Sequence, residues 1–145
     1  MYEYRCEIVR VVDGDTVDIN IDLGFGVWLN DERVRLMGVD TPESRTSDKV
    51  EKLFGYAAKA FVEAALPVGS MQQLATKKYD SKGKFGRILG DFDVYDVVTD
   101  SWKPATQIMI SEGHAVLYHG QAKADVAEAH LANREKLISE GIVIL

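Results

Sequence analysis

The sequence is poor in cysteine, proline and long apolar runs, and each shortage excludes a class of protein. Its 145 residues include one cysteine, Cys6, so no disulfide can form within the chain, and we expect Cys6 to be a small buried side chain. Three prolines and no repeat or low-complexity tract leave no linker at which to divide the chain. No apolar run approaches the roughly 20 residues that cross a bilayer. We therefore expect one domain over residues 1–145 and no contact with a membrane.

Positive charge is also scarce. The chain has 17 lysines and arginines against 23 aspartates and glutamates, a formal net charge of -6. This balance argues against a broad basic surface for nucleic acid, although it leaves room for a local basic site. The opening residues, MYEYRCEIVRVVDG, lack the basic stretch followed by an apolar stretch that is typical of an export signal. We expect a soluble, cytoplasmic protein.

Two hydrophobic periods alternate along the chain. Apolar residues occupy every second position from Thr16 to Leu23, which indicates a half-buried strand. From 48 to 66 they follow helical spacing, with Ser47 or Asp48 as the cap and Gly55 inside, where we expect a close contact. Similar reasoning predicts strands over 4–12, 33–39, 72–79 and 87–95 and helices over 104–112 and 122–140. This order predicts an α+β fold, a five-stranded OB-type β-barrel with three helices.

Two carboxylates distant in the sequence are expected at one rim of this barrel. Asp15 lies just before the strand over 16–23, and Asp40 just after the strand over 33–39. If these strands pair antiparallel, with "GFG" and "LND" breaking the chain between them, the start of one lies beside the end of the other. Glu43 follows in the same loop. Oxygen ligands without cysteine or histidine suit a hard cation, Ca²⁺ or Mg²⁺, rather than zinc.

Two arginines are expected near the same rim. Arg35 lies on the strand that leads to Asp40, and Arg87 opens the strand after "KGKFG". An arginine fork matches phosphate oxygens and keeps its charge. A cation, two arginines and a carboxylate that accepts a proton are together the components of metal-assisted phosphodiester hydrolysis.

Three segments in order, "VVDGDTVDI", "RVRLMGVDTPE" and "KGKFGRIL", resemble the staphylococcal nuclease (thermonuclease) family. The resemblance covers nearly the whole chain. It implies a monomeric, calcium-dependent nuclease on an OB-fold barrel, which hydrolyses DNA and RNA to 3′-phosphorylated products.

The resemblance also implies a metal site. Asp15 and Asp40 would ligate calcium by their side chains, and Thr41 by its backbone carbonyl. Glu43 would activate or position the attacking water. Asp13 would lie near the metal without ligating it.

A substrate site follows from the same resemblance. Arg35 and Arg87 would clamp the scissile phosphate and stabilise its transition state. Lys84 and Tyr118 fall near positions that contact the nucleotide in the family.

Some features depart from the family pattern. The family's best-known secreted members are strongly basic and carry an export signal, whereas this chain is acidic. Phe85 stands where a tyrosine is common, and the segment over 24–32 is longer than in the short forms. The pattern is typical of phage-borne or intracellular bacterial members.

Other functions remain open on the sequence. "DG" before a strand is usually only a turn, and Arg35 or Arg87 alone would be an ordinary strand residue. OB barrels commonly bind single strands without cleaving them, so a non-catalytic nucleic-acid or protein binding module is the main alternative. A hydrolase of small nucleotides would use the same residues. His114, His119 and His130 are not expected to form a ligand set.

Overall fold

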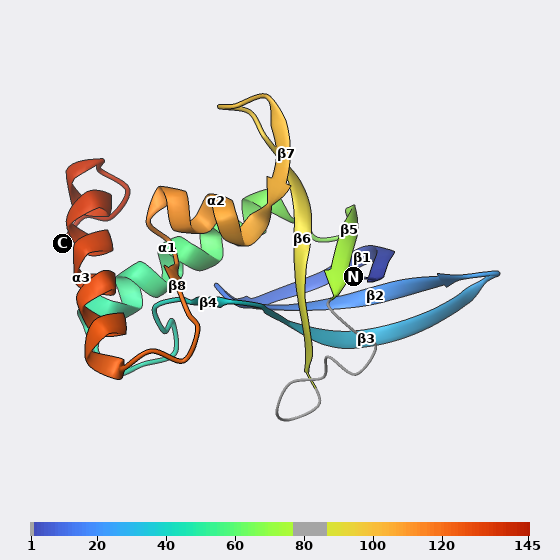
Figure 1. Ribbon diagram of the computed structural model, residues 1–145, viewed down its shortest axis with the longest axis horizontal. Helices are drawn as coiled ribbons and strands as arrows, with labels where there is room; N and C mark the ends of the chain where they lie inside the picture. Colours follow the sequence, from blue (N-terminus) through green and yellow to red (C-terminus); the bar gives the residue numbers. More distant parts are fainter. Residues whose placement is uncertain (1, 77–86) are drawn as a thin grey trace.

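The computed structural model describes residues 2–76 and 87–145, so the predictions for Lys84 and Phe85 lie outside the described residues. The described chain contains three α-helices and eight short or long strands (Figure 1). The strands are β1 (Tyr2–Asp13), β2 (Thr16–Gly24), β3 (Val27–Leu36), β4 (Val39–Asp40), β5 (Met71–Thr76), β6 (Ile88–Asp96), β7 (Ser101–Pro104) and β8 (Val116–Leu117). The helices are α1 (Lys49–Ala65), α2 (Ala105–Glu112) and α3 (Lys123–Ser139).

Six strands form one sheet in the order β3-β2-β1-β5-β6-β7, and β3 also pairs with β6. All of these pairings are antiparallel except β3 with β6, which is parallel. β4 pairs with β8 in a separate two-stranded sheet. The sequence-based expectation of an α+β fold with three helices is thus confirmed for the described chain, with a mostly antiparallel sheet.

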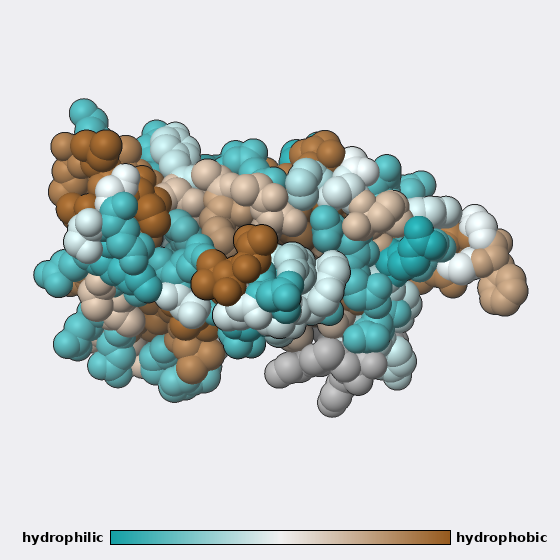
Figure 2. Space-filling model, turned by 90° about the horizontal axis from the view of Figure 1, so that it is seen from above, coloured by the Kyte–Doolittle hydropathy of each residue, from teal (hydrophilic) through white to brown (hydrophobic). Residues whose placement is uncertain are grey.

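The β2–β3 hairpin is longer than predicted. The strand expected over 33–39 begins at Val27, because only the turn at Phe25 and Gly26, both with positive φ, interrupts the chain. At "LND" the strand continues through a bulge, where Asp31 has φ 56° and its N–H donates to Oδ1 of Asn20 at 2.8 Å. The hairpin projects from the body on the side away from α3 (Figure 1). It forms a narrow extension with an apolar end, where Phe25 is fully exposed (Figure 2).

Helix α1 starts and packs as the sequence indicates. The carboxylate of Asp48 accepts from the N–H groups of Val50 and Glu51, so Asp48 is the cap. Gly55 is buried against the loop before the helix. A Cβ at this position would lie 2.5 Å from the carbonyl carbon of Glu43 and 2.6 Å from the nitrogen of Ser44. The close contact expected at Gly55 is therefore confirmed, and it brings that loop onto the helix.

Two apolar clusters hold the molecule together. The larger one lies between the main sheet, α1 and α2, with Phe92, Leu74 and Leu66 fully buried. Cys6 also belongs to it, and burial raises the pKa of its thiol to about 12. The smaller cluster joins Phe54 of α1 to Leu137 of α3 and to Val143 of the C-terminal segment. This second cluster fixes α3 beside the N-terminal half of α1 (Figure 1).

The short strands were not predicted. β4 and β8 are two residues long and β7 is four, which is too short for a hydrophobic period to be visible. Among residues 2–76 and 87–145, no helix combines the length and the apolar character needed to cross a membrane.

Candidate functional site

The rim predicted from the sequence forms where β2 begins and β3 ends. In the antiparallel register of these strands, Thr16 lies opposite Arg35. The backbone N–H of Leu36 donates to the carbonyl oxygen of Asp15 at 2.8 Å. Asp15 and Arg35 are therefore neighbours, as the pairing of the two strands required.

The "DGD" turn before β2 is packed against α1. A Cβ at Gly14 would lie 2.8 Å from Cβ of Ala58, so the turn and the helix approach too closely for a larger residue. Asp13, on one side of Gly14, accepts from the hydroxyl of Ser44 at 2.7 Å. Its carboxylate thus fastens the loop after β4 to the start of β2, while Asp15 faces Arg35.

The loop after β4 carries three predicted site residues. Thr41 is buried, and the N–H of Glu43 donates to Oε2 of Glu51 on α1 at 3.0 Å. Gly55 permits the peptide between Glu43 and Ser44 to rest on the helix. The sequence thus positions this loop through one glycine, one carboxylate and the start of one helix.

Negative charge accumulates around Glu43. Partial burial raises the pKa of its carboxyl, and the charges of Asp13, Asp15, Glu51 and Asp40 raise it further, in that order of importance. Four carboxylates therefore lie close enough to disfavour a fifth charge. Such a cluster is stabilised by a bound cation.

Arg35 reaches into this acidic region. Its guanidinium donates to the carbonyl oxygens of Leu36 at 2.8 Å and Val39 at 3.2 Å. Its Nη1 lies 3.4 Å from Oδ2 of Asp15. The backbone contacts hold the guanidinium in place, and the longer contact with Asp15 leaves its fork available to a phosphate.

His130 of α3 contacts the second predicted ligand. Its Nε2 lies 2.7 Å from Oδ2 of Asp40. The sequence analysis did not assign this residue, because 90 positions separate it from Asp40 and no motif links them. The tertiary contact between α3 and the β4 loop could not be read from either segment alone.

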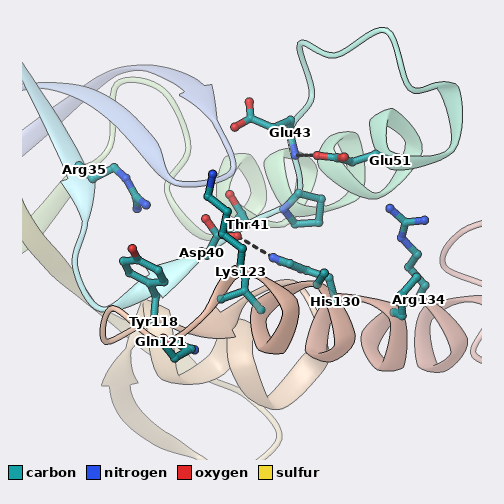
Figure 3. Close-up of a pocket in the computed structure, with 14 residues that line it drawn as sticks. Arg35, Asp40, Thr41, Glu43, Glu51, Tyr118, Gln121, Lys123, His130 and Arg134 are labelled. Atoms are coloured by element: carbon teal, nitrogen blue, oxygen red, sulfur yellow. Dashed lines mark hydrogen bonds and ion pairs between the residues drawn. The ribbon is translucent and has the colours of Figure 1, made fainter.

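A cavity of about 580 Å³ opens at this place (Figure 3). Five predicted site residues line it: Arg35, Asp40, Thr41, Glu43 and Tyr118. The predicted residues Asp13, Asp15 and Arg87 are not part of this lining. Asp15 nevertheless joins the group through Arg35, and Asp13 through the charge that it exerts on Glu43.

Arg87 lies immediately before β6. β6 runs parallel to β3, with Leu89 opposite Arg35. Since side chains alternate along a strand, Arg87 is expected on the same face as Leu89 and Arg35, one step earlier.

The donor set fits a hard cation in its chemistry, although it is not drawn together in the structure. Within the two described stretches, no three His, Cys, Asp or Glu side chains lie close enough to hold a metal ion. Asp40 is turned to His130 and Asp15 to Arg35. The oxygen-only donors and the surplus of negative charge around Glu43 match what Ca²⁺ requires.

The far wall of the cavity is a face of α3 that the sequence analysis missed. Lys123, His130 and Arg134 line it together with apolar residues of the same helix. Their spacing of seven and four residues puts them on one side of a helix, which is the signal that could have found them. It carried no information on which surface that side would face.

Comparisons with known proteins agree with this site. The model of the family described as staphylococcal nuclease homologue matches residues 33–139. A thermonuclease of Staphylococcus intermedius is 39% identical over 84 residues, which are 57% of this chain and 44% of the relative. An uncharacterized protein of Methanocaldococcus jannaschii, MJ1439, is 32% identical over 102 residues, 59% of this chain and 46% of that protein.

A further relative, endonuclease YhcR of Bacillus subtilis, is 26% identical over 121 residues, 80% of this chain and 9% of the relative. The matched part thus spans less than half the length of each of these three relatives. The family model, by contrast, covers most of this chain, from the end of β3 through α3. The chain therefore belongs to the staphylococcal nuclease homologue family.

Proposed function

We propose that the chain is a calcium-dependent nuclease that hydrolyses phosphodiester bonds of DNA and RNA and leaves 3′-phosphorylated products. Its family supports this, since two of the relatives are named as a thermonuclease and an endonuclease. The pairing of β3 with both β2 and β6 supports the OB-type barrel on which such a site would be built.

One observation carries the proposal: Arg35, Asp40, Thr41, Glu43 and Tyr118 line a single cavity. They come from β3, β4, the following loop and the segment after β8. A packing role does not explain why a fixed guanidinium and carboxylates should face an open space. Hydrolysis of a phosphodiester needs these groups within reach of one phosphorus atom.

In the proposed reaction, water attacks phosphorus and the bond from phosphorus to the 5′ oxygen breaks. Glu43 accepts the proton of the attacking water or orients that water. The leaving 5′ oxygen takes up a proton, so the products are a 3′-phosphate and a free 5′-hydroxyl. Arg35 and Arg87 would hold the phosphate oxygens and offset the charge that develops in the transition state.

Asp15, Asp40 and the carbonyl of Thr41 would hold calcium, with Asp13 nearby and outside the ligand set. When bound, the cation polarises the phosphate and offsets its charge. Asp40 and Asp15 would exchange their contacts with His130 and Arg35 for it. Release of Arg35 from Asp15 would free its guanidinium for the phosphate.

Incubation of the purified protein with denatured DNA, with calcium or with a chelator, tests the proposal. Degradation only in calcium, with 3′-phosphate ends, is the expected result. Full activity in chelator would overturn the calcium assignment. No degradation in either condition, together with measurable DNA binding, would instead identify a non-catalytic OB-type binding module.

A substrate of one phosphodiester and a plasmid separate the two enzymatic alternatives. A nuclease is expected to turn over the longer substrate at least as efficiently. Clear preference for the dinucleotide would favour a hydrolase of small nucleotides.

A further inference from the structure

The cavity extends well beyond the residues that the proposed reaction uses. From Arg35 and Tyr118 it continues past Asp40 to the face of α3, and it ends at Arg134 (Figure 3). Arg134 thus lies on the opposite side of Asp40, Thr41 and Glu43 from Tyr118 (Figure 3). A substrate confined to the first part of the cavity would leave the second part unused.

Arg134 is poorly satisfied where it stands. Its Nε is buried and has no hydrogen-bond partner among the described residues. Its guanidinium lies over the ring of Phe54, with Cζ 5.2 Å from the ring centre. This stacking fixes the group without using its donors. A buried unpaired donor in a native protein calls for an explanation, and a ligand is one.

Carboxylates of the same cavity are engaged elsewhere. Glu51 accepts from the N–H of Glu43, and Asp40 contacts His130. Neither forms an ion pair with Arg134, although all of them line the cavity. Arg134 therefore keeps a positive charge that these acidic groups do not neutralise by contact.

The surface between Arg134 and the proposed catalytic residues is apolar. Pro42 forms one wall, and Val126, Ala127 and Leu131 of α3 form the other. Such walls suit the sugar and base of a nucleotide, and a guanidinium at the end suits its phosphate. Arg134 is set in this position by the small core of Phe54 and Leu137, which fixes α3 against α1.

We propose that Arg134 binds a phosphate of the substrate strand next to the scissile one, on the side away from Tyr118, and that the α3 face holds the nucleotide between them. This inference rests on the proposed function. It makes the site one that spans a strand on both sides of the cleaved bond, and so favours cleavage within a chain over removal of a terminal nucleotide.

The first test compares two substrates in calcium. One is a dinucleotide, which has only the scissile phosphate, and the other is an oligothymidylate of about ten nucleotides, within the range of site sizes of OB folds. Arg134→Gln is expected to lower kcat/KM on the oligonucleotide roughly tenfold to a hundredfold, as for the loss of one charged hydrogen-bonded contact. The loss on the dinucleotide should be at least tenfold smaller. Equal losses on both substrates would overturn the proposal.

Arg5→Gln is the matched control. Arg5 is an exposed arginine of β1 that does not line this cavity, so its removal changes the net charge by the same amount. It should leave the ratio between the two substrates unchanged. Thermal unfolding of Arg134→Gln shows whether α3 is still docked.

The second test does not depend on turnover. Binding of the labelled oligothymidylate is measured at several salt concentrations with Glu43→Gln and with Glu43→Gln/Arg134→Gln. Loss of one phosphate contact should lower the slope of log K against log salt by about 0.7 for a single strand. An unchanged slope would overturn the proposal even if the chain proved to bind without cleaving. Absence of cleavage with the expected change in slope would overturn the proposed function alone.

Discussion

Nε2 of His130 on α3 lies 2.7 Å from Oδ2 of Asp40, at the end of β4. The contact joins the helix that forms one wall of the cavity to the carboxylate that is proposed as a calcium ligand. A partner of this kind orients a ligating carboxylate and restricts its rotation.

Replacement of His130 should therefore weaken calcium binding without removing a ligand. We expect His130→Ala to raise the calcium Kd by roughly tenfold to a hundredfold, which is typical of a lost partner of a metal ligand. His130→Gln keeps a donor at a similar reach and should lose less. Isothermal titration calorimetry of calcium without substrate measures this. A tighter affinity in His130→Ala would mean that His130 competes with the ion.

The two arginines should act on turnover more than on folding. Arg35→Ala and Arg87→Ala are each expected to lower kcat by roughly 10²–10³-fold, the usual cost of losing a donor to transition-state charge. Lysine at either position restores the charge but not the fork, so it should recover only part of the rate. Single-turnover cleavage of an oligonucleotide checks this. A kcat near that of the unaltered chain would remove the arginine in question from the site.

Gly55 should be one of the few helical positions where alanine is worse than glycine. Its added Cβ would meet the backbone of Glu43 and Ser44 at 2.5 and 2.6 Å, and neither backbone atom can yield without moving the loop. We expect Gly55→Ala to lower the free energy of unfolding by roughly 1–3 kcal/mol, as overpacking does. It should also lower nuclease activity, because the displaced loop carries Glu43.

An opposite substitution in the same helix is the control. Ala60 is exposed on α1, so Ala60→Gly should cost about 1 kcal/mol through helix propensity alone. Urea unfolding of both variants gives the two signs. A more stable Gly55→Ala would show that the loop is free to move off the helix.

The sequence was sufficient for the elements with a strong local signal. Helix α1, its Asp48 cap and the strand that alternates from Thr16 were predicted within a residue or two. The turn chemistry of the β2–β3 hairpin was misjudged at "LND". There a bulge, closed by Asn20 from the neighbouring strand, lets the strand continue, and that partner is invisible to a local pattern.

The candidate site divides in the same way. Asp15 and Arg35 were predicted to meet because antiparallel pairing of two neighbouring strands dictates it, and they do. Asp40, Thr41 and Glu43 follow from a short loop. The wall formed by His130 and Arg134 depends on where α3 docks, and that is decided by the small core of Phe54, Leu137 and Val143. No periodicity within α3 specifies those partners.

Asp18 should give the fold part of its pH dependence. Its buried carboxylate accepts from Arg33 at 2.8 Å and from Arg10 at 2.9 Å, and these bonds hold its pKa below the ordinary value of 3.8 despite the opposing effect of burial. A lowered folded pKa contributes stability above the ordinary value, and this is lost as the pH falls through the folded pKa. We expect Asp18→Asn to cost roughly 1–3 kcal/mol at pH 7 and progressively less in acid.

Urea unfolding of Asp18→Asn and of the unaltered chain over a range of pH values measures this. Glu3→Gln, at an exposed position of β1, controls for the change in net charge. A difference between the two chains that stays constant down to strongly acidic pH would show that packing, and not charge, is what Asp18 supplies.

Glu43 allows the chemistry and the binding of the cation to be separated. Glu43→Gln keeps the size of the side chain and removes its ability to accept a proton, so kcat should fall by roughly 10²–10⁴-fold. Because Asp15, Asp40 and the carbonyl of Thr41 are the proposed ligands, the calcium affinity should change far less than kcat. Single-turnover kinetics and calcium titration on the same preparation give both values. Loss of calcium binding parallel to the loss of rate would instead make Glu43 a primary ligand, and the proton would then have to pass to the solvent.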